Sequence, residues 1–221
     1  MSVLIYRDPK TVGVAAATMI AAHLIADQKF VFGADYHEML LPTYDSLSAM
    51  TENGLLNWDE SHVFQLFEFL PDETGDQRIA NLLGKALFSK TDISDQQYSV
   101  PFSASMPPEI TAEVFEQSIL DDGGFDIALI AVRHEGSLLM NRSVDCDPET
   151  HVEQDEEDGF ITVGLSALMQ TKHPIIVATG KNSAEAVKKM LQGTISDAPL
   201  AALRLHPGAT FLLDEEAAEL L

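Results

Sequence analysis

The chain has few basic residues, a single cysteine and no long uncharged run. Cys146 is the one cysteine among 221 residues, so an internal disulfide is excluded, which fits a reducing compartment. Thirteen lysines and arginines stand against 35 acidic side chains, giving a formal net charge of −22. This charge repels nucleic-acid phosphates and anionic lipid, so we expect no nucleic-acid and no membrane partner. It favours solubility, with a cationic partner as the alternative.

The longest nearly uncharged stretch, Thr11 to Ala26, is shorter than the roughly 20 residues of a membrane span. We therefore expect a buried, alanine-rich helix there. The first residues, Met1 to Tyr6, contain no basic region and no small-residue cleavage site, so no export signal is predicted. Together with the cysteine count, these absences indicate a cytoplasmic protein.

Strand and helix patterns alternate along the chain. The run Phe125 to Val132 is almost wholly apolar, which is typical of a central strand buried on both faces of a parallel sheet. Asp8-Pro9 supplies the N-cap and the first-turn proline of a helix. Further strands are expected at 3–6, 29–33, 63–70, 160–163, 174–179 and 210–213, and further helices at 43–53, 76–88, 107–120, 183–191 and 215–221. This order predicts an α/β fold, a three-layer Rossmann-like and mostly parallel sheet with helices on both faces.

No linker divides the chain, so we predict a single domain over residues 1–221 with an acidic insertion or hairpin near 145–159. The acids of that segment lack the alternate spacing and the central glycine of a calcium loop. Cys146 lies among them, and neighbouring acids disfavour a thiolate. The segment is therefore predicted to be a solvated hairpin and not a cation site.

Several scaffold segments occur in an order that is typical of one family. Asn57-Trp58 precedes a predicted strand, and the run from Leu87 to Ile93 follows it. Later, Gly159 to Gly164 contains T-V-G, and Leu203 to Pro207 has the sequence L-R-L-H-P. By these segments the chain resembles the glucosamine-6-phosphate deaminase/6-phosphogluconolactonase superfamily over most of its length. The resemblance implies an α/β fold and sugar-phosphate chemistry in carbohydrate metabolism.

The same resemblance implies losses at three active-site motifs. The family's phosphate loop, G-L-P-T-G-G-T-P, corresponds to residues 33–40, where only Gly33 is kept. Such loops hold an anion on converging N–H groups, and Asp35 and Glu38 add negative charge there. In the second motif, Phe67 stands where the deaminases have the aspartate that moves a proton, while Glu68 matches the neighbouring family glutamate.

The third motif, G-N-D-G-H…N-E, orders a catalytic histidine with two acids in the family. Here Glu135 replaces the aspartate, Ser137 replaces the histidine and Arg142 replaces the second acid, while Gly136 and Asn141 match. The histidine would activate water in the lactonases, so that reaction is affected as well. These changes predict that the parent reaction is impaired.

Several candidate residues are expected to gather at the carboxyl ends of the strands, where open α/β sheets bind ligands. They are Asp35, His37, Glu38, Glu68, His134, Glu135 and Arg142. The candidate catalytic residues are Glu68, Glu135 and Arg142, and the candidate ligand-binding residues are Gly33, Asp35, His37, Glu38, His134, Gly136, Ser137, Gly164 and His206. We expect no cofactor and no bound metal, with a metal held by His37 and His134 as the alternative.

Three kinds of function remain open. The first is an enzyme of the deaminase/isomerase type that acts on a sugar phosphate or a related small molecule, with a lactonase-like hydrolase as its variant. The second is a non-catalytic ligand sensor or regulatory subunit, and the third is a structural partner of an active homologue. A small-molecule ligand is expected in the first two cases, and a homo-oligomer is compatible with all three.

Overall fold

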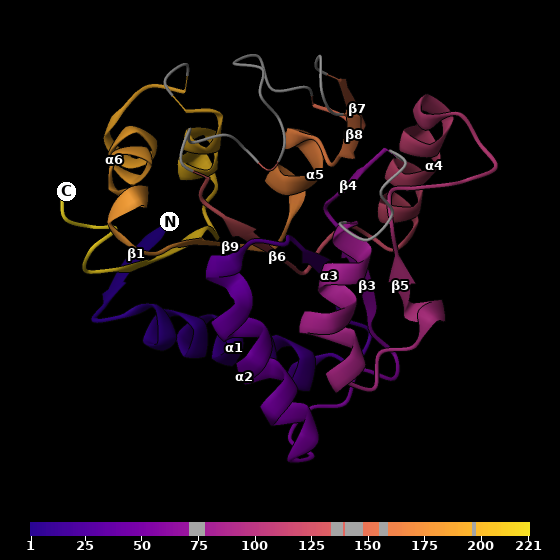
Figure 1. Cartoon of the computed structure of the whole chain (residues 1–221), viewed down its shortest axis with the longest axis horizontal. Coiled ribbons are helices and arrows are strands. Elements are labelled where there is room, and N and C mark those ends of the chain that lie inside the picture. Colours follow the sequence, from indigo (N-terminus) through magenta and orange to yellow (C-terminus); the bar gives the residue numbers. More distant parts are fainter. Residues whose placement is uncertain (71–77, 134–138, 140–147, 155–158, 196–197) are drawn as a thin grey trace.

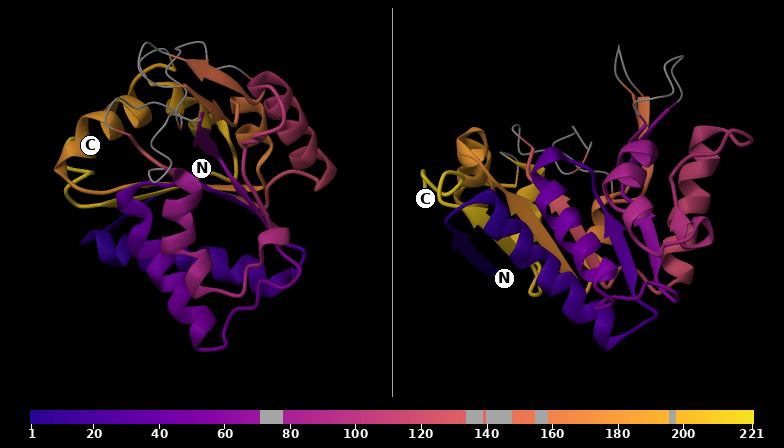
Figure 2. Two further views of the ribbon diagram at one scale, coloured as in Figure 1. Left: turned by 45° about the vertical axis from the view of Figure 1, so that its right-hand side comes forward. Right: turned by 60° about the horizontal axis from the view of Figure 1, so that its bottom comes forward.

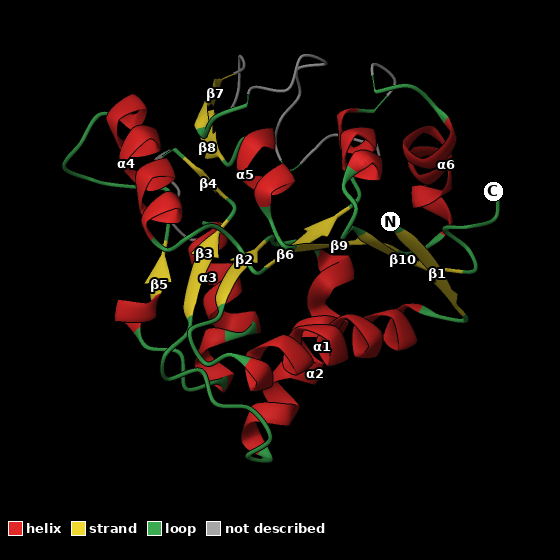
Figure 3. Cartoon of the chain, turned by 180° about the vertical axis from the view of Figure 1, so that it is seen from behind, coloured by secondary structure: helices red, strands yellow, loops and turns green. Residues whose placement is uncertain are grey.

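A seven-stranded parallel sheet forms the centre of the protein. The computed structural model describes residues 1–70, 78–133, 139, 148–154, 159–195 and 198–221. The strands lie in the order β1 (Ser2–Tyr6), β10 (Thr210–Asp214), β9 (His173–Ala178), β6 (Ile127–Ala131), β2 (Val31–Ala34), β3 (His62–Gln65) and β5 (Tyr98–Ser99), as Figure 3 shows from behind. Every neighbouring pair in this order is parallel. The predicted α/β class with a mostly parallel sheet is confirmed.

Helices cover both faces of this sheet (Figures 1 and 2). The first face carries α1 (Pro9–Ala26), α2 (Leu41–Glu52) and α3 (Ile79–Ala86), and the second carries α4 (Pro108–Asp121), α5 (Leu165–Gln170) and α6 (Ala184–Gln192). Short 3-10 helices are η1 (Glu38–Leu40), η3 (Phe88–Lys90), η4 (Asp95–Gln97), η5 (Lys181–Ser183) and η6 (Pro199–Leu205). The layers of helix, sheet and helix follow from strands that are apolar on both faces.

Strand β6 shows how one sequence run serves two cores. Ile127, Leu129 and Ala131 belong to the core under α1, α2 and α3, while Ala128 and Ile130 belong to the core under α4, α5 and α6. All five are 0% exposed. Successive side chains point to opposite faces of a strand, so only a continuously apolar run can fill both cores.

Helix α1 packs on the sheet and on α2. Asp8 is its N-cap, and its Oδ1 accepts the Thr11 N–H at 2.7 Å. By length and composition alone α1 could also cross a membrane. One face of it, however, packs into the first core, and a Cβ at Gly13 would lie 2.5 Å from Pro42 Cβ of α2. The close approach of the two helices therefore requires glycine at this position.

The predicted strand at 63–70 is not one strand. It divides at Leu66 into β3 of the main sheet and β4 (Phe67–Phe69), which pairs antiparallel with β8 (Gly159–Thr162) in a second sheet completed by β7 (His151–Gln154). Leu66 bonds both sheets, because its N–H donates to Ala34 O and its carbonyl accepts from Val163 N–H. Residues 151–154 and 159 of the acidic segment thus lie in the antiparallel strands β7 and β8, while residues 145–147 and 155–158 lie outside the described residues.

The predicted helix at 215–221 is wrong. The chain forms turns there instead of a helix. Asp214, the last residue of β10, accepts the N–H groups of Ala217 and Gly180 on its carboxylate. The first turn after β10 is therefore tied to the loop after β9 by side-chain bonds.

Candidate active site

The carboxyl ends of the parallel strands form one edge of the sheet, which we call the carboxyl edge. Strands β3 and β5, which follow β2 in sequence, lie on one side of it in the sheet. Strands β9 and β10, which follow β6, lie on the opposite side. The junction between β2 and β6 is therefore the topological switch point of the sheet. Open α/β sheets bind ligands at this point, beyond the carboxyl ends of the strands.

A buried ion pair occupies the switch point. Asp35 follows β2 and is 0% exposed, and Arg133 follows β6 with a side chain that is 12% exposed. The guanidinium donates to both carboxylate oxygens, over 2.8 Å from Nη2 to Oδ1 and 3.1 Å from Nη1 to Oδ2. Ala131 N–H also donates to Oδ2 at 2.9 Å, and Nη1 lies 3.4 Å from Ala131 O. Asp35 is therefore neutralised, and it does not present a free negative charge to a ligand as its sequence position suggested.

Aromatic side chains surround this pair. The Tyr44 hydroxyl donates to the backbone carbonyl of Asp35, and burial, followed by the nearby Asp35 charge, raises the pKa of Tyr44 well above its usual range. The Arg133 guanidinium lies over the Phe67 ring, 5.2 Å from its centroid. Phe67 itself is 2% exposed and packs edge-on against Phe69. The position where the deaminases have their proton-moving aspartate is therefore part of an apolar wall here.

The candidate catalytic residue Glu68 is fully buried and already bonded. Its carboxylate accepts the N–H groups of Phe69 at 2.8 Å, Ile79 at 3.1 Å and Ala80 at 3.0 Å, and also the Gln65 side-chain amide at 3.1 Å. Ile79 and Ala80 begin α3, so Glu68 satisfies donors that the helix start leaves unpaired. The Arg78 Nε atom lies 3.8 Å away. These contacts give Glu68 a positioning role, and its catalytic role stays a prediction.

Gln65 connects Glu68 to strand β5. Its side-chain oxygen accepts from the Tyr98 hydroxyl, and its amide donates to Phe67 O at 2.6 Å. Burial raises the pKa of Tyr98 well above its usual range, with the Glu68 charge as a further cause. The carboxyl edge thus holds a hydrogen-bonded network of polar groups from β3, β4, β5 and α3. Each hydrogen bond in it helps to orient the side chain that makes the next one.

The other candidates at this edge have local structural roles. Gly33 lies where a Cβ would come within 2.9 Å of Leu66 Cδ2, so a side chain there would require the Leu66 side chain to shift. His37 is the N-cap of η1, and its Nδ1 accepts the Met39 N–H at 3.3 Å. Glu38 is exposed. Gly164 begins α5, where a Cβ would lie 2.2 Å from Glu149 O.

Some candidates are not brought to this edge or are not described. His206 is buried beside residues 171–173 at the amino end of β9, which is the opposite edge of the sheet. Its Nδ1 accepts the Gly208 N–H at 3.1 Å, and burial lowers the pKa of its imidazole. His134, Glu135, Gly136, Ser137 and Arg142 lie outside the described residues. In the described ranges no three histidine, cysteine or acidic side chains lie close enough together to hold a metal ion.

Arg133 and Gln65 are the residues that sequence reasoning missed as site candidates. The signal for Arg133 was available, because it is the first charged side chain after the apolar run 127–132 and therefore falls at a strand end. Its partner could not be foreseen, since Asp35 lies 98 residues earlier. Gln65 carried no comparable signal, because a single amide in a short strand is common.

The fold and the charged pair at its switch point define a doubly wound α/β protein with a candidate ligand site at the carboxyl edge. The family model described as Glucosamine-6-phosphate isomerases/6-phosphogluconolactonase matches residues 38–212. The chain therefore belongs to this family, and the resemblance predicted from the sequence is confirmed.

Individual relatives agree with this assignment. The chain is similar to glucosamine-6-phosphate deaminases of Corynebacterium aurimucosum, with 29% identity over 100% of this chain and 94% of the relative, and of Pseudoalteromonas translucida, with 26% identity over 100% and 90%. Among solved structures, a monomeric glucosamine-6-phosphate deaminase has a TM-score of 0.92 at 23% identity, covering 100% of both chains. A 6-phosphogluconolactonase from Thermotoga maritima has a TM-score of 0.80 at 19% identity, covering 96% of this chain and 98% of that one. At these identities the solved structures show the fold alone.

Proposed function

We propose that this chain is a divergent family member that binds a sugar phosphate or a similar small molecule at the carboxyl edge and is impaired in the deamination of glucosamine 6-phosphate. The curated relatives are named for that deamination. The proposal departs from them because of the contacts made by the loop after β2, by Phe67 and by Arg133.

The main support for impaired deamination is that the N–H groups of this loop donate hydrogen bonds to other groups of the protein. In the loop that corresponds to the family's phosphate loop, Asp35 N–H donates to Leu129 O, and Met39 N–H donates to His37 Nδ1. Leu40 and Leu41 N–H groups donate to the carbonyls of His37 and Glu38. An anion needs converging, unused N–H groups. These four donors, three in the loop and one at the start of α2, are therefore not offered to a phosphate.

Phe67 supports the same conclusion from a second motif. A phenyl ring accepts no proton, and it stands where the deaminases move one. The nearby carboxylates do not replace it, because Asp35 is paired with Arg133 and Glu68 accepts three backbone N–H groups. A carboxylate held in this way is a poor general base for a substrate, since its lone pairs already face other donors.

Arg133 supports ligand binding. The described bonds use three of its five N–H groups, two toward Asp35 and one toward Ala131 O. A guanidinium held by Asp35 beside the Phe67 ring is preorganised to donate to a further oxygen atom of a ligand. The acidity of the chain, at −22, makes such a held cation the natural anchor for an anionic group. We also place the protein in the cytoplasm, with its metabolic relatives.

Two assays test the proposal. Ammonia release from millimolar glucosamine 6-phosphate should stay at background, beside an active deaminase as the positive control. A thermal-shift series should then compare sugar phosphates, the matching unphosphorylated sugars and inorganic phosphate. We expect at least one sugar phosphate to raise the unfolding midpoint by several degrees, since ligand at 100 times Kd stabilises by about 2.7 kcal/mol. Inorganic phosphate alone should have little effect.

The impaired deamination and the ligand binding are tested independently of each other. Ammonia release at a rate near that of the positive control contradicts the impairment. Absence of a shift with every compound contradicts ligand binding and favours the structural-partner alternative. Arg133→Lys is the matched variant, because it keeps the charge but loses the paired geometry, so a ligand anchored at Arg133 should lose most of its shift.

A further inference from the structure

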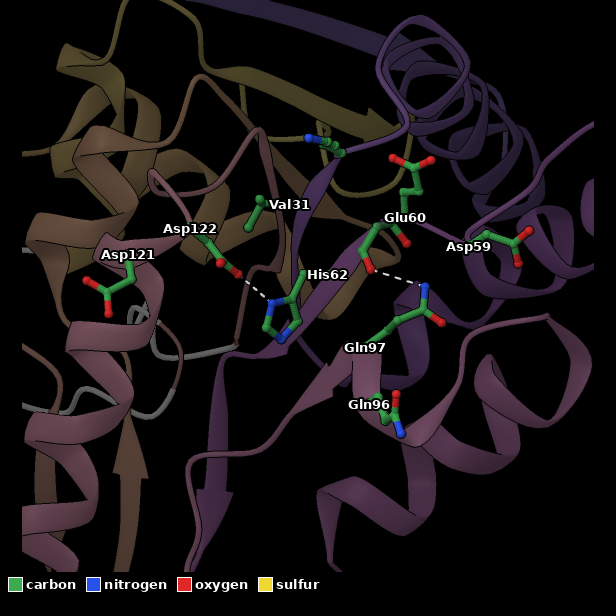
Figure 4. Close-up of a pocket in the computed structure, with 10 residues that line it drawn as sticks. Val31, Asp59, Glu60, His62, Gln96, Gln97, Asp121 and Asp122 are labelled. Atoms are coloured by element: carbon green, nitrogen blue, oxygen red, sulfur yellow. Dashed lines mark hydrogen bonds and ion pairs between the residues drawn. The ribbon is translucent and has the colours of Figure 1, made fainter.

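A second group of reactive side chains lies at the amino edge of the sheet, formed by the amino ends of the strands. A cavity of about 480 Å³ opens there beside the starts of β2 and β3 and the end of α4 (Figure 4). His62, the first residue of β3, lies in its wall with Asp122 and Gln97. His62 and Gln65 are the two ends of β3, about 10 Å apart at strand rise, so this cavity is separate from the carboxyl edge.

His62 connects a carboxylate to a hydroxyl. Its Nδ1 pairs with Asp122 Oδ2, and its Nε2 lies 2.9 Å from the Ser99 Oγ atom. The imidazole lies against the Phe64 ring, with centroids 4.2 Å apart, which holds its plane. With the ring proton on Nδ1 facing Asp122, Nε2 is the acceptor for the Ser99 hydroxyl proton. This is the order of contacts found in Ser-His-Asp sites, in which acid, base and nucleophile follow one another.

Three separate elements set this geometry. Asp122 is the C-cap of α4, and Gly123 and Gly124 follow it with φ of 85° and 80°, which ends the helix and leaves the carboxylate facing β3. Ser99 ends β5 and pairs with Phe64 in the parallel register, so it lies beside the strand that carries His62. The imidazole side chain is 30% exposed and the Asp122 side chain 34%. The pair is therefore fixed by the fold but open to a small molecule.

We propose that Asp122, His62 and Ser99 form a second site in which Ser99 is an activated nucleophile toward carboxylic esters. Ser99 Oγ adds to the ester carbonyl carbon while its proton moves to His62 Nε2. The bond from that carbon to the leaving oxygen then breaks, and His62 returns the proton to this oxygen. A water molecule, deprotonated by His62, next attacks the acyl-serine, which releases the carboxylic acid and restores Ser99. Asp122 holds the imidazole orientation and balances its charge.

Of the three residues, His62 and Asp122 line the cavity, so the cavity's charges act on an ester that approaches His62 through it. The lining includes four acidic residues, Asp59, Glu60, Asp121 and Asp122, and also Lys29. The carboxylates in the lining attract a cationic ligand and repel an anionic one, and salt screens both effects. The site therefore favours esters that carry a cationic group, then neutral esters, and it disfavours esters that carry a carboxylate.

Covalent labelling of the full chain is the direct test. A fluorophosphonate reacts with activated serines, and mass spectrometry locates the adduct. We expect labelling at Ser99 and slow hydrolysis of p-nitrophenyl acetate, slow because oxyanion donors supply a large share of the rate in efficient serine hydrolases. Ser99→Ala, His62→Gln and Asp122→Asn should each lower the labelling or hydrolysis rate by at least about 100-fold, the usual range for loss of a nucleophile or its base. Ser103→Ala, at a half-buried serine bonded to Ser105, is the control and should leave both rates unchanged.

Each outcome decides the matter. Adducts on Ser99 that depend on His62, and faster turnover of a trimethylammonium ester than of a carboxylate ester, support the proposal. No adduct on Ser99, or labelling of Ser99 that is unchanged in His62→Gln, overturns it. Each variant is compared with the parent by circular dichroism and thermal midpoint, so that loss of folding is not mistaken for loss of the nucleophile. A sugar phosphate that binds at the carboxyl edge leaves this result unaffected.

Discussion

The two edges of the sheet use charge in opposite ways. At the carboxyl edge, Asp35 and Glu68 are both 0% exposed, and their oxygens accept from Arg133 and from backbone N–H groups. At the amino edge, the Asp122–His62 pair is about one-third exposed and borders a cavity. Charges buried with complete sets of partners are costly to unpair, whereas exposed ones contribute little to stability and stay available for chemistry. The difference separates groups that hold the site together from groups that are free to react.

The largest expected effect is at the switch point. Arg133→Ala leaves Asp35 as an unpaired charge in a buried position and should lower the free energy of unfolding by about 3–5 kcal/mol. Urea denaturation measures this change. Asp122→Ala at the amino edge is the matched control and should cost no more than about 1 kcal/mol, because its pair is partly exposed.

The double variant Asp35→Leu with Arg133→Met sharpens this test. It removes both charges, so it should be more stable than Arg133→Ala. If Arg133→Ala and Asp122→Ala lowered the free energy of unfolding equally, the proposed difference between the charges at the two edges would be wrong.

A smaller effect is expected at Glu68. Glu68→Gln keeps the size of the side chain but replaces one acceptor oxygen with a donor that faces the N–H groups at the start of α3. Hydrogen bonds to charged groups contribute about 1.5–3 kcal/mol, so the free energy of unfolding should fall by that amount. The measurement is again urea denaturation, with hydrogen exchange of α3 amides to locate the loss. A fully stable variant would indicate that Glu68 is not needed for positioning and would restore it as a catalytic candidate.

The smallest effect is a pH dependence at the amino edge. Burial lowers the pKa of His206 below the ordinary histidine value of about 6.5. The unfolded chain therefore takes up this proton at a higher pH than the folded one. The contribution to stability is complete above about pH 6.5 and is lost as the pH falls through the lowered value.

His206→Asn tests this dependence. Asparagine can still accept the Gly208 N–H but does not titrate, so the fall in unfolding midpoint on acidification should be shallower than in the parent. His23, whose pKa is also lowered by burial and by His173, contributes with the same sign. Identical slopes in the parent and in His206→Asn would mean that other groups account for the acid sensitivity.

Much of the fold could be predicted, because apolar runs and caps are local signals. Strand β6 and the start of α1 follow directly from Phe125 to Val132 and from Asp8-Pro9. The break at Leu66 could not be predicted, since an apolar residue in an apolar run gives no sign that its N–H and carbonyl bond different sheets. The Asp35–Arg133 pair was missed for a related reason. Its partners are brought together by the order of strands and not by their positions in sequence.

The amino-edge group was missed because its three residues belong to unrelated segments. His62 begins a strand, Ser99 ends another and Asp122 ends a helix, and none of them belongs to a motif. Reactive residues were expected at the carboxyl ends of strands, because open α/β sheets bind ligands there. Only the register of β3 with β5 and the end of α4 bring this group together.

Strand β1 is the first strand of the chain, and its neighbour in the sheet is β10, the last. Ser2 pairs with Thr210 and Tyr6 with Asp214, so β1 can pair only after β10 has been synthesised. Contacts of such long sequence separation slow folding, since loop closure must precede them. Until β10 is made, the apolar side chains of Val3, Leu4 and Ile5 stay without their final neighbours. Val3, Leu4 and Ile5 are still 36%, 37% and 53% exposed in the folded protein, so this apolar edge strand can associate with another strand edge both before and after folding.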